Sequence, residues 1–122
     1  MNKKGYFRFE KLTVWNDARK FVSLIYKITD TFPQRERFGL VDQIRRAAVS
    51  ISLNIAEGSN KNSDPDFRRF LRMAQGSVNE VVTGLYLALD QKLVNQKQFD
   101  EAYESALILN AKLNALIKSI SH

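Results

Sequence analysis

The residues best suited to chemistry form a row of polar side chains in an otherwise apolar segment. The row steps by 3, 4, 4 and 3 positions and consists of Gln43, Arg46, Ser50, Asn54 and Glu57. These steps place all five residues on one face of an α-helix. A helix that is apolar on its other sides is usually buried or shared between subunits. We therefore expect the row to find ionic and hydrogen-bonding partners, because burying an unpaired charge is costly.

The partners expected for this row lie on the next helix. If the segments 39–58 and 64–91 form a hairpin about residues 59–62, Arg46 comes level with Ser77 and within reach of Glu80. We predict an Arg46–Glu80 ion pair surrounded by hydrogen bonds. The complete predicted network is Gln43, Arg46, Ser50, Asn54, Glu57, Ser77 and Glu80.

A catalytic interpretation of this network is weaker than a structural one. Arg46, Glu57 and Glu80 could form an acid–base site, but the two glutamates are expected at different heights along the helices. The only histidine is His122, and the sequence has no Glu-x-x-His pair, glycine-rich phosphate loop or nucleophile motif. We interpret the network as a device that fixes helix register, and we predict no enzyme activity, no cofactor and no metal.

Four helical segments are expected to position these residues in a single all-α domain over residues 1–122. Apolar residues step alternately by 3 and 4, which predicts helices at 14–31, 39–58, 64–91 and 96–120. Sustained spacing of this kind with short connections indicates an antiparallel up-down-up-down four-helix bundle. Residues 6–10 are the one stretch that could be extended.

The helix ends carry recognisable signals. Thr13, Ser63 and Asn95 can cap helix N-termini, Pro33 should stop the first helix, and Gly58 suits the position just after the second. Inside the third helix, Gly76 and Gly84 each cost about 1 kcal/mol relative to alanine. Close approach of another helix would account for both glycines.

The long helices carry more apolar residues than one bundle core needs. The surplus comprises Phe70, Met73, Val82, Tyr86, Leu93, Tyr103, Leu107, Ile108 and Ile117. Ordinary scatter is one interpretation, since much of any protein surface is apolar. We favour a second interpretation, an interface between copies of the chain, because wide apolar faces recur on both long helices.

The charge of the chain is unevenly placed. The net charge is +6, with residues 1–72 at +7 and residues 73–122 at −1. A basic half favours binding to polyanions, although a solvated basic face is the alternative. The candidate nucleic-acid contacts fall in two patches expected at opposite ends of the bundle: Arg35, Arg37, Lys61, Arg68, Arg69 and Arg72.

The N-terminal segment mixes cations with aromatic rings, as base-stacking platforms do. Its members are Lys3, Lys4, Tyr6, Phe7, Arg8, Phe9 and Lys11. The alternative is a segment whose rings cover the bundle, which we favour for Phe9. The chain has no cysteine, no apolar leader and no run of about 20 apolar residues, so we expect a cytoplasmic protein without a membrane segment.

Three phrases of the sequence carry a family resemblance. FEKLTVW at 9–15, QIRRAAVSISLNIAEGS at 43–59 and FRRFLRMAQGSVNEV at 67–81 resemble the bacterial 23S rRNA intervening-sequence protein family, over nearly the whole chain. The resemblance implies an up-down-up-down bundle assembled in five-fold rings. It also implies a distant likeness to the accessory protein of diversity-generating retroelements, a basic pentameric barrel that binds a reverse transcriptase and nucleic acid. The family has no established catalytic residues, and its signature polar positions match Arg46, Asn54, Glu57, Ser77 and Glu80.

Together these observations predict a non-catalytic, basic homo-oligomer, a pentamer by resemblance, that associates with RNA or DNA. RNA related to the ribosome is the first candidate. The alternative is a scaffold that docks a protein partner through its surplus apolar surface and binds no nucleic acid.

Overall fold

The protein is described by a computed structural model that covers residues 5–120, and all its regular elements are helical. Lys3, Lys4 and His122 lie outside the described residues. Four α-helices and two short 3₁₀ helices follow one another as η1 (Arg8–Lys11), α1 (Thr13–Thr29), η2 (Gln34–Glu36), α2 (Leu40–Ser59), α3 (Asp64–Asp90) and α4 (Gln96–Ser119). The prediction of an all-helical chain built on four helices is confirmed.

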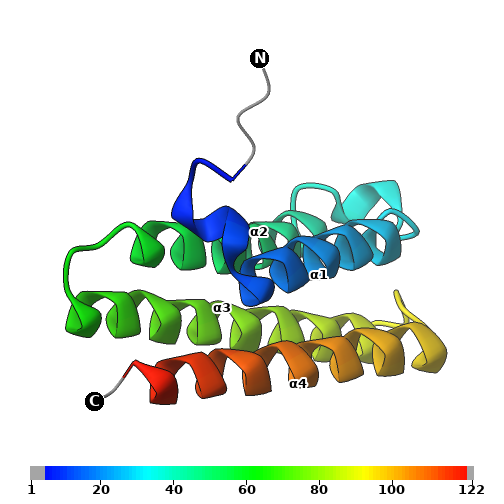
Figure 1. Ribbon diagram of the computed structural model, residues 1–122. Coiled ribbons are helices and arrows are strands. Elements are labelled where there is room, and N and C mark those ends of the chain that lie inside the picture. The colour runs from blue at the N-terminus through cyan, green and yellow to red at the C-terminus, as the bar shows by residue number, and fades with distance from the viewer. Residues whose placement is uncertain (1–4, 121–122) are drawn as a thin grey trace.

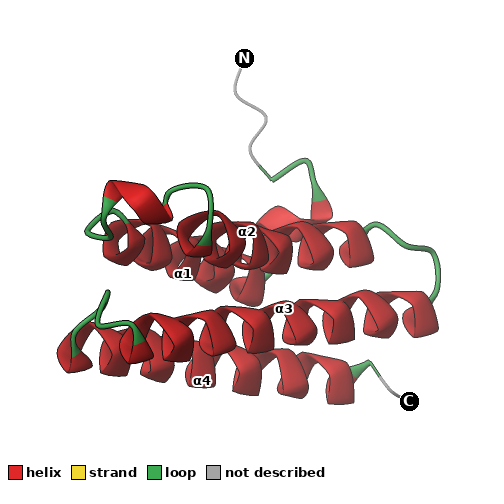
Figure 2. Cartoon of the chain, turned by 180° about the vertical axis from the view of Figure 1, so that it is seen from behind, coloured by secondary structure: helices red, strands yellow, loops and turns green. Residues whose placement is uncertain are grey.

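The helices lie in two layers, α1 beside α2 and α3 beside α4 (Figure 1). The α1–α2 and α3–α4 connections lie at the same end of the molecule, and the α2–α3 connection lies at the other end with the last turn of α4 (Figure 1). The view from behind shows the same arrangement (Figure 2). Helices α2 and α3 share the most extensive contact. Within the described residues, no helix is long and apolar enough to cross a lipid bilayer.

The core forms from the apolar residues that recur at helical spacing. Six apolar residues that step alternately by 4 and 3 from α1 into the connection after it are all buried: Val14, Ala18, Phe21, Ile25, Ile28 and Phe32. The last turns of α4 differ from expectation, because Ile117, which was predicted among the surplus residues, joins the core. Steps of four from Leu109 through Leu113 keep Ile117 on the face that points inward.

Two of the expected helix caps are present. The Ser63 side chain accepts a hydrogen bond from the Asp66 amide at 3.3 Å, and Asn95 accepts one from the Gln98 amide at 2.7 Å. The expectation that Thr13 caps α1 is wrong, because Thr13 is already helical and Leu12 is the N-cap residue. Helix α1 also ends at Thr29, four residues before Pro33.

The N-terminal segment turns where an extended stretch was expected at residues 6–10. The Glu10 carboxylate accepts hydrogen bonds from the Phe7 amide at 2.9 Å and the Gly5 amide at 3.2 Å. These bonds draw the segment into a turn that leads into η1. Gly5 has φ +87°, a left-handed conformation that a side chain would strain.

The glycines of α2 and α3 have different surroundings. Gly58 lies inside α2 and not after it, and a Cβ there would lie 2.7 Å from Phe70 Cβ. A Cβ on Gly84 would lie 2.6 Å from Ile44 Cγ1, so the close approach expected at Gly84 is confirmed. A Cβ on Gly76 would meet no atom within 4 Å in the described part of the chain. The reason predicted for Gly76 is therefore not found within one chain.

We predict opposite effects of alanine at two glycines of the same helix. Gly84→Ala should destabilise the fold by about 1–3 kcal/mol, because the buried Ile44 cannot move away from the new methyl group. Gly76→Ala should stabilise the monomer by about 1 kcal/mol through helix propensity alone. Urea unfolding of the two variants at matched concentration measures both effects. Equal destabilisation by both variants would contradict this description of the α2–α3 contact.

Candidate nucleic-acid interface

Part of the predicted polar network lies at the junction of α2 and α3. The Ser50 and Ser77 hydroxyls are hydrogen-bonded at 2.8 Å. The Asn54 amide donates to the Ser50 carbonyl at 2.9 Å and to the Ser50 hydroxyl at 3.1 Å. Ser77 is buried, so these bonds satisfy polar groups that lie away from water. The Ser50–Ser77 bond joins the two helices at one height, and Asn54 supports it from within α2.

The charged members of the predicted network do not meet as expected. The Arg46 side chain is 75% exposed, and its Nε lies 3.9 Å from Asp42 Oδ2 on the same helix. Glu80 and Gln43 are also exposed. The predicted Arg46–Glu80 pair is therefore wrong for the single chain. The small serines occupy the α2–α3 junction, and the long Arg46 side chain stays in water, where its charge is solvated.

Glu57 is the remaining member of the predicted network. Its carboxylate pairs with Lys61 at 3.1 Å, one turn further along the chain. This contact places Glu57 near the α2–α3 connection and away from Glu80, which lies in the middle of α3. The two glutamates are thus separated along the bundle, as the argument against an acid–base site required.

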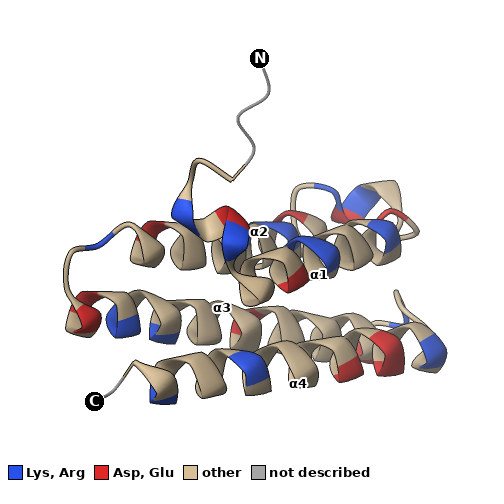
Figure 3. Cartoon of the chain, in the orientation of Figure 1, with Lys and Arg blue, Asp and Glu red and all other residues tan. Residues whose placement is uncertain are grey.

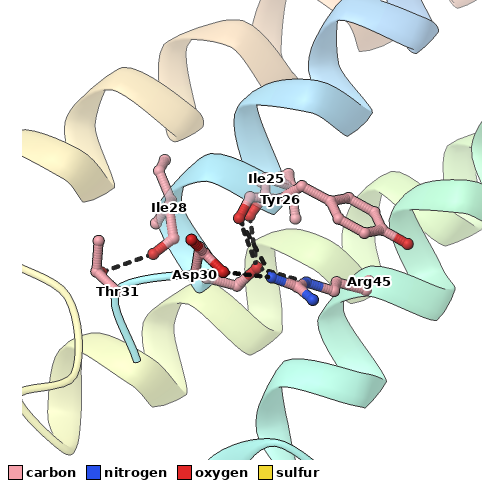
Figure 4. Close-up of polar contacts among 7 residues, drawn as sticks. Ile25, Tyr26, Ile28, Asp30, Thr31 and Arg45 are labelled. Atoms are coloured by element: carbon pink, nitrogen blue, oxygen red, sulfur yellow. Dashed lines mark hydrogen bonds and ion pairs between the residues drawn. The ribbon is translucent and has the colours of Figure 1, made fainter. Parts of the chain in front are cut away.

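Arg45, and not the neighbouring Arg46, makes polar contacts with another helix, and that helix is α1, whereas the predicted partner Glu80 lies on α3 (Figure 4). Its Nε donates to the Thr29 hydroxyl at 2.9 Å, and Nη2 donates to the Tyr26 carbonyl at 3.3 Å. The guanidinium also lies 4.4 Å from the centre of the Tyr26 ring and 3.9 Å from Asp30. Arg45 therefore binds the C-terminal end of α1, where the helix dipole favours a cation. The sequence signal that could have indicated this role is the position of Arg45 directly after the core residue Ile44.

The α2–α3 end of the molecule holds one of the two predicted basic patches (Figure 3). Lys61 Nζ and the Arg69 guanidinium lie 5.1 and 4.6 Å from the centre of the Phe70 ring. Arg69 Nε also lies 3.7 Å from Asp66 Oδ1. Arg72 is exposed one turn further along α3. These contacts hold Lys61 and Arg69 in place on a ring while leaving Arg69 and Arg72 open to solvent.

Arg68 has a structural contact that was not expected. Its Nη1 donates to the Ile120 carbonyl at 2.6 Å, and the side chain is partly buried. The bond satisfies a free carbonyl at the end of α4 and joins that end to α3. Arg68 therefore belongs to the fold, and its replacement should cost stability, whereas the sequence alone indicated an exposed contact residue.

Arg35 and Arg37 lie at the opposite end, in the α1–α2 connection. Arg35 is exposed and pairs weakly with Glu36 at 4.0 Å. Arg37 borders a cavity of about 790 Å³ whose lining includes Tyr26 and Phe38. Phe38 is 91% exposed. The six predicted contact residues thus fall at two ends of the bundle and do not form one surface.

A second, apolar hollow of about 300 Å³ lies between α3 and α4. Val82, Tyr86, Tyr103 and Leu107 line it, and the two tyrosine rings contact each other edge to face at 6.4 Å. Asn110 also lines the hollow, and its Oδ1 is buried without a hydrogen-bond partner among residues 5–120. The surplus apolar residues predicted on both long helices therefore gather, in part, on one surface.

The comparisons with known proteins bear on the same residues. The family model described as 23S rRNA-intervening sequence protein matches residues 10–115. The chain belongs to this family. The match includes the α2–α3 junction and all six predicted contact residues, and it confirms the resemblance carried by the three sequence phrases.

A solved structure supports the family's fold. A protein of unknown function from the S23 ribosomal protein family of Bacteroides thetaiotaomicron is 26% identical to this chain, with a TM-score of 0.78. The similarity covers 87% of this family member and 99% of the solved chain. Among curated proteins, no significant match is found.

We predict that the two neighbouring arginines of this family member differ in their effect on stability. Arg45→Ala should lower the free energy of unfolding by about 1.5–3 kcal/mol, because it removes charged hydrogen bonds to the end of α1. Arg46→Ala should change it by about 0–1 kcal/mol, as expected for an exposed ion pair. Thermal and urea unfolding of both variants test this difference. A larger loss for Arg46→Ala would restore the buried Arg46–Glu80 network.

Proposed function

We propose that the chain is a cytoplasmic, non-catalytic subunit of a basic homo-oligomer that binds nucleic acid, with RNA as the first candidate. The observation that carries this proposal is the group of cations at the α2–α3 end. Lys61, Arg69 and Arg72 lie together there, and Arg8 contacts the end of α2 through the Ser59 carbonyl at 3.4 Å. Cations gathered on one end attract phosphate groups without reading base sequence.

A group of acidic residues at the opposite end of the molecule favours the α2–α3 end as the place where nucleic acid binds. Asp100, Glu101 and Glu104 are exposed on α4, towards the opposite end from Lys61 (Figure 3). These acidic residues repel a polyanion from their part of the surface. At the α2–α3 end, Glu57 and Asp66 pair with Lys61 and Arg69 and so offset part of the attraction there. Arg35 and Arg37 provide a second, smaller attraction at the α1–α2 connection, which we propose as a secondary contact.

The proposed oligomer uses the surface between α3 and α4. Leu107 is 55% exposed there, beside Tyr86 and Tyr103, which are also exposed. An apolar surface of this kind is typical of a contact between proteins. We propose that up-down-up-down bundles assemble through it into a ring, and a pentamer is the assembly that the family resemblance implies. A ring would multiply the basic ends and so raise the avidity for a long polyanion.

The alternative function is a protein-interaction scaffold that binds no nucleic acid. The apolar hollow beside Tyr86 and Leu107 favours it, because a partner helix could fill the same surface. Nuclease treatment distinguishes the two proposed functions. A protein partner that remains bound after nuclease digestion, with no affinity of the purified chain for RNA, would favour the scaffold.

We predict that RNA binding depends on salt and on the α2–α3 end. The triple variant Lys61→Gln, Arg69→Gln, Arg72→Gln should weaken binding of single-stranded RNA. It should also make the slope of log affinity against log salt shallower by about 2, because each phosphate contact contributes about 0.7. Fluorescence anisotropy at several salt concentrations measures both quantities.

The matched control for this experiment is the variant Arg35→Gln, Arg37→Gln, which removes cations from the opposite end. It should change the slope less than the triple variant. A wild-type chain without affinity for RNA or DNA at low salt would overturn the nucleic-acid proposal and leave the scaffold.

We predict that the chain is larger than one subunit in solution. Light scattering coupled to size-exclusion chromatography should give a mass that is a multiple of 14.0 kDa. The variant Tyr103→Glu, Leu107→Glu should dissociate the assembly, because it places charges in an apolar contact. A wild-type monomer, or an assembly indifferent to this variant, would contradict the proposed α3–α4 interface.

A further inference from the structure

The N-terminal segment forms a continuous series of aromatic contacts. Tyr6 and Phe7 meet edge to face with ring centres 5.1 Å apart, and Phe7 stacks on Phe9 at 5.6 Å with 16° between the ring planes. Phe9 in turn packs on Trp15 of α1 at 4.6 Å. The Arg19 guanidinium lies 5.1 Å from the Trp15 ring and ends the series. We call these four rings the aromatic ladder.

The two halves of the ladder have different surroundings. Phe9 is only partly exposed, and Trp15 packs against the hydrophobic core, as expected for rings that cover a bundle. Tyr6 is 77% exposed and Phe7 is 57% exposed. The contacts of Phe9 and Trp15 thus account for the lower half. The rings of Tyr6 and Phe7 remain exposed, and they cover little of the bundle.

The upper half of the ladder is held in one conformation by hydrogen bonds. The Glu10 carboxylate binds the amides of Phe7 and Gly5, which lie on either side of Tyr6. The left-handed conformation of Gly5 completes the turn. Because these contacts order the backbone around Tyr6 and Phe7 before any ligand arrives, less backbone entropy is lost when a ligand binds the two rings.

The ladder lies next to the cations of the α2–α3 end. Arg8, which directly follows Phe7, donates to the carbonyl of Ser59 in the last turn of α2. Lys61 is two residues beyond Ser59 and is held against Phe70 with Arg69. Figure 1 shows η1 above the same part of α2. The Arg8–Ser59 bond therefore places the N-terminal segment beside the end of α2 that leads to Lys61, although the two residues it joins are 51 positions apart in sequence.

We propose that Tyr6 and Phe7 stack on unpaired bases of a single-stranded nucleic acid whose phosphates contact Arg8, Lys61 and Arg69. This inference rests on the proposed function and deepens it, because it names the form of nucleic acid and the rings that bind it. Stacking requires a free base face, which single strands offer and a duplex encloses. Charge alone would attract both forms.

The test compares single and double strands on ladder variants of the full chain. The probe is a fluorescein-labelled oligonucleotide of about 12 residues without secondary structure, made as RNA and as DNA, alone and annealed to its complement. Tyr6→Ala and Phe7→Ala should each weaken single-strand binding by about 5- to 100-fold, the range found for loss of a stacked aromatic ring. Duplex binding and the salt dependence should stay unchanged, because no cation is removed. Phe38→Ala, which removes an exposed ring at the opposite end, should leave single-strand affinity unchanged.

A second measurement reports stacking directly. Phe7→Trp should keep the single-strand affinity, and its added tryptophan fluorescence should be quenched when the strand binds, beyond any change seen for Trp15 in the parent chain. RNA that binds more tightly than DNA of the same sequence would identify RNA as the strand, and the reverse result would identify DNA; either supports the stacking site.

Three results would overturn the inference. Unchanged single-strand affinity in both alanine variants, with a loss in the Lys61, Arg69, Arg72 variant, would reject stacking and leave the proposed function intact. Dissociation of the assembly by Tyr6→Ala or Phe7→Ala would show that the rings bind a second copy of the chain. No binding of any strand at low salt would reject the inference and the proposed function together.

Discussion

The close contact between α2 and α3 is the constraint on which the rest of the structure depends. At one height, Ile44 lies against Gly84 with no room for a Cβ, and near the connection Gly58 lies against Phe70 in the same way. Between them, Ser50 and Ser77 share a hydrogen bond. Contacts at three heights leave the helices no freedom to slide, because a shift by one turn would bring a side chain against each glycine. The register then fixes the positions of the α2–α3 connection and its cations.

The same contact decides which charged residues face water. With small residues at the junction, Arg46 is turned to solvent, while Arg45, one position earlier, reaches across to the end of α1. A rotation of 100° per residue separates these two environments. The two adjacent arginines therefore have different roles. Arg45 donates hydrogen bonds to a carbonyl and a hydroxyl at the end of α1, and Arg46 contributes to the surface charge. The bond from Arg68 to the Ile120 carbonyl shows the same division between structural and exposed arginines at the far end.

Local signals made most of the fold predictable from the sequence. The Ser63 and Asn95 caps and the buried set of α1 depend on residues within one or two turns, so spacing and residue type suffice. The Arg46–Glu80 pair failed because it required the relative rotation of two helices, which packing decides and spacing does not. The turn at residues 6–10 was missed because the Glu10 carboxylate competes with the extended backbone for the amides of Gly5 and Phe7. The sequence identified the cations of the candidate site. It did not show which of them are exposed and which, like Arg68, make contacts within the fold.

Two features, a glycine in α3 and a buried polar atom in α4, lower the stability of a single chain. Glycine at the exposed position 76 of α3 costs about 1 kcal/mol relative to alanine, and the structure offers it no close neighbour among residues 5–120. The buried Asn110 Oδ1, which lacks a hydrogen-bond partner in the same described range, costs about 1–3 kcal/mol. Both lie on α3 and α4, the helices that carry the exposed Tyr86, Tyr103 and Leu107. A second copy that approached Gly76 closely and donated a hydrogen bond to Asn110 would offset both costs. The proposed assembly would in this way give both positions a partner that one chain does not supply.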